Sequence, residues 1–96
     1  MKILALEKEA PHTQLADFQP HLVDEAAKVY ELYLAGVVRE SYFNATDHTA
    51  VLILECAGVD EARLTVGSLP LVEAGLITFD LIPLVPYSGF SRLLQP

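Results

Sequence analysis

The chain has 96 residues, of which 52% are apolar and 20% are charged. This length suits a single domain over residues 1–96, and the apolar content excludes a disordered acidic tail. Thirteen acidic residues outweigh six basic ones and give a net charge of −7. That charge argues against nucleic-acid binding and against an anionic membrane surface. No apolar run has the length of a signal-peptide core or a membrane span, so we expect a cytoplasmic protein.

The first half of the chain predicts a strand, a loop and a helix. Residues 2–8 form a short apolar run that is typical of a strand, and residues 9–17 indicate a loop. We expect a helix that is capped by Asp17, runs to about Leu34 and stops at Gly36. Four residues of this segment recur on one helical face: Leu22, Ala26, Val29 and Tyr33.

The second half predicts a hairpin, a second helix and a last strand. Residues 37–43 and 49–56 indicate two strands joined by a short turn. A helix is expected over about 59–69, ended by the proline at position 70, and a strand over 76–85. The order βαββαβ predicts an α+β, ferredoxin-like fold with a four-stranded antiparallel sheet and both helices on one face.

The predicted strands are apolar on both faces, as in Ile3–Leu6 and Val51–Leu54. A sheet with one wet face should alternate apolar and polar residues. At about 25 cal/mol per Å² of apolar area, an uncovered second face would forfeit several kcal/mol. We therefore expect a second copy of the chain to cover it, which gives a homodimer through the sheet face and a basis for larger oligomers. The tail, about 86–96, is expected to be irregular and to lie on a neighbouring surface.

The expected strand register assigns side chains to these faces. Pairing Phe43 with Thr49 would place Arg39 opposite Ile53, diagonally next to Glu55. The residues expected to face the helices are Leu4, Leu6, Leu52, Leu54, Ile77, Phe79 and Leu81. The residues expected on the second face include Ile3, Ala5, Glu7, Arg39, Ser41, Phe43, Glu55, Thr78, Asp80 and Ile82. Polar groups on an otherwise apolar face are typical of a ligand cavity, so the cavity is predicted between subunits.

One stretch resembles a known family. Gly36-Val37-Val38-Arg39-x-x-Tyr42 is followed by the hairpin, by Val59-Asp60-Glu61-Ala62 and by Leu69-Pro70-Leu71. Over about residues 36–82 the chain resembles the muconolactone isomerase-like group of dimeric α/β barrels. The resemblance implies a dimeric α/β barrel and cofactor-independent proton transfer. The chain departs from the family's pattern in two places. The tryptophan before the arginine is Val38 here, and apolar residues replace the family's polar C-terminal stretch after position 83.

Arg39 is the first candidate for chemistry, since its guanidinium can bind a carboxylate or stabilise an enolate. The alternative is a structural ion pair with Glu55 or Glu40. Glu7 and Glu55 are candidate general bases, because an apolar cavity raises the pKa of a carboxyl group. Alternatively, Glu7 lies in water at the end of its strand, and Glu55 only forms an ion pair with Arg39.

Histidines and tyrosines supply further candidates. His21, in the first turn of the first helix, is a candidate acid or base. Candidate substrate-binding residues are Tyr33, Tyr42, His48 and Asp80. The spacing of the histidines matches no zinc motif, and no glycine pattern suits a phosphate, so we expect neither metal nor cofactor.

Two groups of residues are expected to be structural. Asp24-Glu25 and Asp60-Glu61 are interpreted as solvated first-turn residues that complement helix dipoles. Cys56 is expected to be a buried small hydrophobe, and because it is the single cysteine no internal disulfide can form.

Two functions remain open from the sequence. The first is a cofactor-independent isomerase that moves a proton on a small oxygenated organic acid or lactone in the barrel pocket. The second is a non-catalytic small-molecule-binding or structural oligomeric barrel. A pocket in which Arg39 meets a carboxyl or imidazole group would favour the enzyme.

Overall fold

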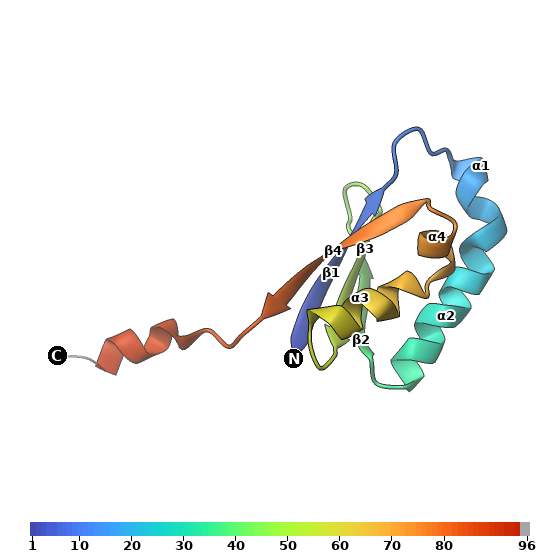
Figure 1. Ribbon diagram of the computed structural model, residues 1–96. Coiled ribbons are helices and arrows are strands. Elements are labelled where there is room, and N and C mark those ends of the chain that lie inside the picture. The colour runs from blue at the N-terminus through green and yellow to red at the C-terminus, as the bar shows by residue number, and fades with distance from the viewer. Residues whose placement is uncertain (95–96) are drawn as a thin grey trace.

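The computed structural model describes residues 1–94 and has the α+β, ferredoxin-like arrangement that the sequence predicts. One antiparallel sheet carries its four strands in the order β2-β3-β1-β4 (Figure 1). The strands are β1 (Lys2–Glu9), β2 (Val38–Phe43), β3 (Ala50–Glu55) and β4 (Ile77–Leu84). The predicted element order is therefore confirmed, with strand ends that differ by at most one residue.

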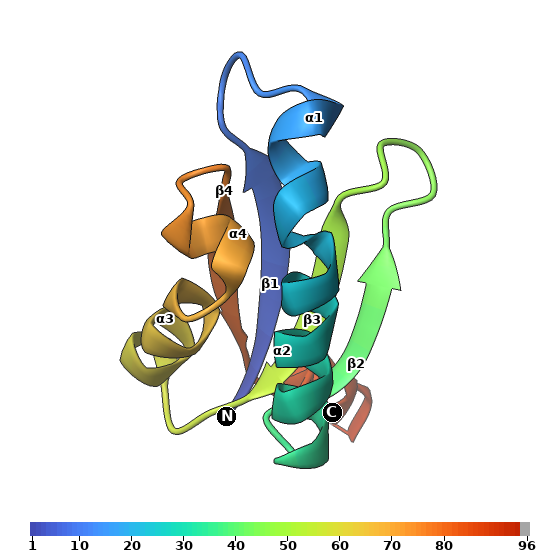
Figure 2. The same cartoon turned by 90° about the vertical axis from the view of Figure 1, so that its right-hand side faces the viewer.

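All the helices between the strands lie on one face of the sheet (Figure 2). The helical elements are α1 (Leu15–Phe18), the 3-10 turn η1 (Gln19–His21), α2 (Leu22–Leu34), α3 (Val59–Gly67) and α4 (Pro70–Glu73). Within residues 1–94, no helix combines the length and the apolarity that a membrane crossing requires.

The first helical segment begins earlier than predicted. Asp17 is not its cap, because the segment starts after Gln14 and the Asp17 carboxylate accepts the Gln14 backbone N–H at 2.8 Å. Pro20 then lies in η1, and the regular helix α2 starts at Leu22. The predicted stop at Gly36 is confirmed. This glycine has φ +78°, and the residue after it donates its backbone N–H to a carbonyl in the last turn of the helix.

The second helix ends two residues earlier than predicted. It stops at Gly67, and Leu69 is extended with ψ 135°. Pro70 opens α4 instead of merely ending α3, because the first position of a helix needs no N–H donor. The apolar face predicted for α3 is confirmed by the buried side chains of Ala62, Val66 and Leu69.

The core lies between the sheet and the α3–α4 side of the helical layer. Ile3, Ala5 and Leu69 are fully buried, and Leu54 is 1% exposed. Cys56 joins the same cluster and is buried, which confirms its interpretation as a small hydrophobe. Helix α2, in contrast, contains no buried residue.

The predicted face assignment of β1 is wrong by one residue. Ile3 pairs with Leu54 and Ala5 with Leu52, so these four side chains share the helix-covered face. Leu4 and Leu6 therefore point to the uncovered face. Because side chains alternate along a strand, a slip of one residue exchanges the two faces completely. Glu7, which pairs with Phe79, consequently lies on the helix side.

A bulge changes the register of β2. The pairing passes from Val38–Leu54 to Glu40–Ile53, and Arg39 is the extra residue between them. Phe43 pairs with Ala50 rather than with Thr49, so the predicted pairing of Arg39 with Ile53 is wrong. Ser41 and Phe43 therefore share the helix-covered face with Leu52 and Ala50.

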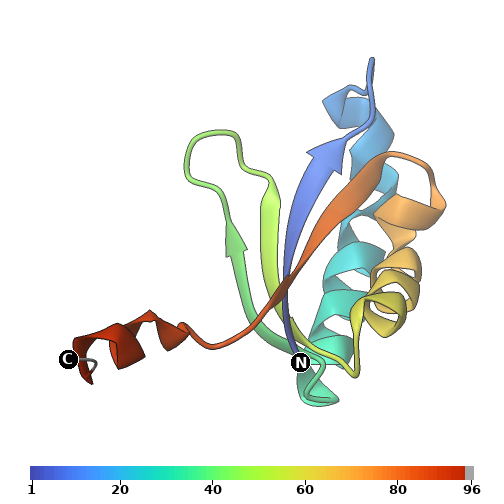
Figure 3. The same ribbon diagram turned by 60° about the vertical axis from the view of Figure 1, so that its left-hand side comes forward.

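The C-terminal segment leaves the sheet after β4 and projects from the body (Figures 1 and 3). It contains the 3-10 helix η2 (Ser88–Leu94), where the sequence predicts an irregular tail. Its exposed large apolar side chains are Val85, Tyr87, Phe90, Leu93 and Leu94. Packing of this tail on a neighbouring subunit stays a prediction, and residues 95–96 of it lie outside the described residues.

Candidate functional site

A cavity of about 1040 Å³ opens between the helices and the sheet. It lies within one subunit, on the helix-covered face, whereas the sequence predicts a cavity on the other face of the sheet. Its walls come from β1, α1, α2, the β2–β3 hairpin and β4. The lining includes carboxyl groups and rings, among them Glu7, Glu25, Tyr30, Tyr33, Phe43 and His48.

Helix α2 forms one long wall of this cavity. The face predicted from Leu22, Ala26, Val29 and Tyr33 points into it. Leu22 is 44% exposed and Tyr33 is 55% exposed, so both ends of this apolar face stay open, while Val29 between them packs against the core. An apolar helix face that stands over an open volume is the usual lining of a small-molecule site.

Glu7 brings a carboxyl group to the floor of the cavity. It follows the buried part of β1, and its Oε1 accepts the Ala50 backbone N–H at 3.1 Å. Burial raises the pKa of Glu7, and the nearby charges of Glu9 and Glu25 add to the rise, although the hydrogen bond opposes it. A half-buried carboxyl group with a raised pKa is suited to take and return a proton.

Glu25 brings a second carboxyl group from α2. Its Oε1 accepts the Leu71 backbone N–H at 2.9 Å, which ties α2 to the start of α4. Burial raises the pKa of Glu25, while the hydrogen bond and the nearby His21 lower it. The interpretation of Glu25 as a solvated residue is therefore wrong.

A signal for Glu25 was present in the sequence. It stands three residues after Leu22 and four before Val29, inside the apolar stripe of α2. A carboxyl group in the middle of an apolar helix face has an environment unlike that of Asp24 beside it.

Aromatic rings make up much of the remaining lining. Tyr30 and Tyr33 are stacked with ring centroids 6.3 Å apart. The Phe43 and His48 rings are stacked at 4.1 Å, and His48 has a left-handed backbone with φ +62°. Among the candidates from the sequence, Glu7, Tyr33 and His48 therefore line one cavity. Tyr42 also borders it, but it pairs with Val51, so its side chain lies on the uncovered face of the sheet. The Tyr42 hydroxyl donates to Glu40 Oε1 at 2.6 Å, which raises the pKa of Tyr42.

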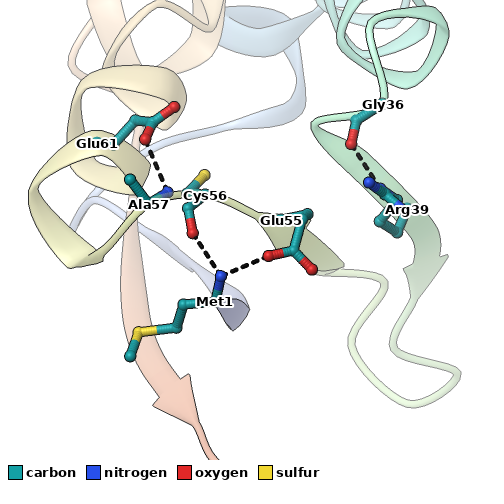
Figure 4. A network of polar contacts seen from close by, with 7 residues as sticks. All are labelled: Met1, Gly36, Arg39, Glu55, Cys56, Ala57 and Glu61. Atoms are coloured by element: carbon teal, nitrogen blue, oxygen red, sulfur yellow. Dashed lines mark hydrogen bonds and ion pairs between the residues drawn. The ribbon is translucent and has the colours of Figure 1, made fainter.

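Arg39 and Glu55 lie outside this cavity, and Figure 4 shows the polar contacts that they form instead. The Arg39 Nε donates to the Gly36 carbonyl at 2.6 Å, next to the bulge. Glu55 accepts a hydrogen bond from the amino group of Met1, and this bond is the main reason why the pKa of Glu55 is lowered. The expected salt bridge between Arg39 and Glu55 does not form among the described residues.

His21 and Asp80 also stand outside the lining. His21 ends the 3-10 turn before α2, close enough to Glu25 to lower the pKa of its carboxyl group. Asp80 forms an exposed ion pair with Lys8 at 2.8 Å on the uncovered face of the sheet. Across residues 1–94, no cluster of three or more potential ligands is arranged to hold a metal ion.

The comparisons with known proteins concern the fold. A muconolactone isomerase matches with a TM-score of 0.75 and 17% identity, over 92% of each chain. The chain has the fold of muconolactone isomerase. The 5-chloro-2-hydroxyhydroquinone dehydrochlorinase of Burkholderia phenoliruptrix AC1100, solved with 2,5-dihydroxybenzoquinone, matches with a TM-score of 0.71 and 19% identity. That match covers 93% of this chain and 98% of the other.

The ferredoxin-like fold implied by the sequence resemblance is thus confirmed by two solved structures, while the dimer implied with it stays a prediction. No protein-family model matches the sequence, and no curated protein matches it. At such low identities the shared fold does not determine the chemistry, which depends on the side chains of this chain's own cavity.

Proposed function

We propose that this chain is a small-molecule enzyme of the isomerase type, which moves a proton on an oxygenated ring without a cofactor. The observation that carries this proposal is the Glu7 carboxyl group, half-buried and held by a backbone N–H in a large apolar cavity. The likeness in fold to two enzymes that act on small oxygenated molecules supports it.

The chemistry assigned to Glu7 is a transfer between two carbon atoms. The ionised carboxylate takes a proton from a carbon beside a carbonyl group, and the electron pair of the broken C–H bond forms an enolate. A hydroxyl group of Tyr30 or Tyr33 donates a hydrogen bond to the enolate oxygen. Where a ring double bond adjoins that carbon, it is conjugated with the enolate, and the Glu7 carboxylic acid returns the proton to the far end of the double bond, which regenerates the enzyme.

The test follows the exchange of ring-carbon hydrogen for deuterium in heavy water by NMR. Uncharged unsaturated lactones and hydroquinones serve as probes, and muconolactone and 2,5-dihydroxybenzoquinone, which are anions at neutral pH, complete the panel. We expect the wild type to accelerate exchange for at least one probe and Glu7→Gln to reduce the rate by about 100-fold or more, the usual contribution of a general base. Asp60→Asn removes an exposed carboxyl group outside the cavity and should leave the rate unchanged.

Binding without any acceleration of exchange would contradict the enzyme. It would support the second function considered from the sequence, a non-catalytic binding or structural barrel. An unchanged rate in Glu7→Gln would instead show that another group moves the proton.

We also propose that the chain forms a homodimer. The face of the sheet opposite the helices carries Leu4, Leu6, Ile53 and Ile82, and no helix in the described part of the chain covers it. A homodimer through this face would bury these side chains and leave the cavity of each subunit open on the far side.

A further inference from the structure

Apart from the imidazole of His48, the acidic and basic side chains that line the cavity are all carboxyl groups. Three carboxyl groups line it, those of Glu7, Glu9 and Glu25. Within residues 1–94, no lysine or arginine side chain contributes to the lining. A carboxylate ligand would meet these groups in a half-buried setting, where the repulsion between like charges is screened less than it is in water.

Glu7 and Glu25 enter this cavity from different layers. Glu7 stands on the sheet and Glu25 on α2, and the charge of Glu25 acts on Glu7. Each carboxyl group uses Oε1 to accept one backbone N–H, from Ala50 and from Leu71. The backbone thus fixes the direction of each group and leaves its Oε2 for a ligand.

We infer that this cavity selects an uncharged, hydroxylated ring over an organic anion, and that Glu25, acting with Glu7, sets this selectivity. The inference deepens the proposed function and rests on it. The hydroxyl groups of such a ring can donate to the carboxylate oxygens, and its apolar faces fit the rings of Phe43 and Tyr33. The sequence predicts an organic acid as the ligand. The structure does not favour one, because Arg39, the residue expected to bind that acid, lies outside the cavity lining.

An uncharged ligand also finds partners when the carboxyl groups take up a proton, which their burial favours. When protonated, the same groups donate hydrogen bonds, and a neutral ring oxygen can accept them. The pair therefore serves a neutral ligand in either protonation state.

The test compares three phenols that differ in one substituent. These are 4-hydroxybenzyl alcohol, 4-hydroxybenzoate and 4-hydroxybenzylamine, titrated into the protein at neutral pH and followed by NMR. We expect the neutral alcohol to bind at least about tenfold more tightly than the carboxylate, a modest factor for like charges near a half-buried site. Tightest binding of the carboxylate or of the amine would overturn the inference while leaving a ligand site in place. Failure of all three to bind would contradict the proposed function as well.

Two variants separate the charge of Glu25 from its structural contact. Glu25→Gln keeps an oxygen that can accept the Leu71 N–H but removes the charge, so the preference for the alcohol over the carboxylate should shrink several-fold. Asp24→Asn removes a neighbouring exposed charge on the same helix and should leave that preference unchanged. An equal loss of affinity for all three phenols in Glu25→Gln would assign Glu25 a purely structural role and overturn its part in the inference.

Discussion

Two carboxyl groups, Glu7 and Glu25, give the cavity its character at the scale of single residues. Both are half-buried, both accept one backbone N–H, and burial raises the pKa of both. Glu55 shows the contrast, because it is exposed beside the amino terminus and its pKa is lowered. The same side chain is therefore suited to proton transfer in one place and to a simple ion pair in another.

The raised pKa values predict how stability depends on pH. Between the ordinary value of 4.5 and the raised values, the folded chain binds more protons than the unfolded chain, so the free energy of unfolding falls as pH rises. Glu7→Gln and Glu25→Gln cannot ionise. Each should be more stable relative to the wild type at pH 7 than at pH 4, by about 0.5 kcal/mol, because solvent screens half-exposed groups.

Urea unfolding at the two pH values measures this difference. A relative stability that is the same at pH 4 and pH 7 would contradict the raised pKa of the carboxyl group concerned.

At the scale of elements, the register of β1 decides which side chains form the core. Ile3 is fully buried against the helices, whereas Leu4 points to the uncovered face. We expect Ile3→Ala to cost about 2–5 kcal/mol of stability, as deletions in a packed core do. Leu4→Ala should cost about 1 kcal/mol or less in a monomer, since it leaves no cavity in the core.

Chemical denaturation of both variants as monomers, at a protein concentration below the range of dimer formation, measures the two losses. Equal losses, or a larger loss for Leu4→Ala, would contradict the observed pairing of Ile3 with Leu54.

At the scale of the whole molecule, the uncovered sheet face and the projecting tail both expose apolar side chains. Ile82 is 41% exposed on that face. We expect the chain to sediment as a homodimer with twice its mass of 10.5 kDa. Ile82→Glu should convert it to a monomer, because the partner face would bury an unpaired charge. Leu64→Glu, at an exposed position of α3 away from the sheet, should stay dimeric.

Analytical ultracentrifugation distinguishes these states. A wild type that sediments as a monomer at all accessible concentrations would contradict the dimer. A chain that ends at Val85 tests the tail separately, since tail packing on a neighbour predicts a dimer that dissociates more readily without it.

The sequence by itself determined the order of the elements, the stop at Gly36 and the core face of α3. These depend on local patterns: a period of two or 3.6 residues, a left-handed glycine, and turns between apolar runs. It also indicated Glu7, Tyr33 and His48 as residues of interest, which the structure brings to one cavity.

Only the tertiary structure decided on which side of the sheet the cavity lies. The bulge at Arg39 and the one-residue shift of β1 are set by packing between strands, which no single strand encodes. The same packing places Arg39 outside the cavity and Glu25 inside it. A local pattern gives each strand two faces, but the partners of that strand decide which face meets the helices.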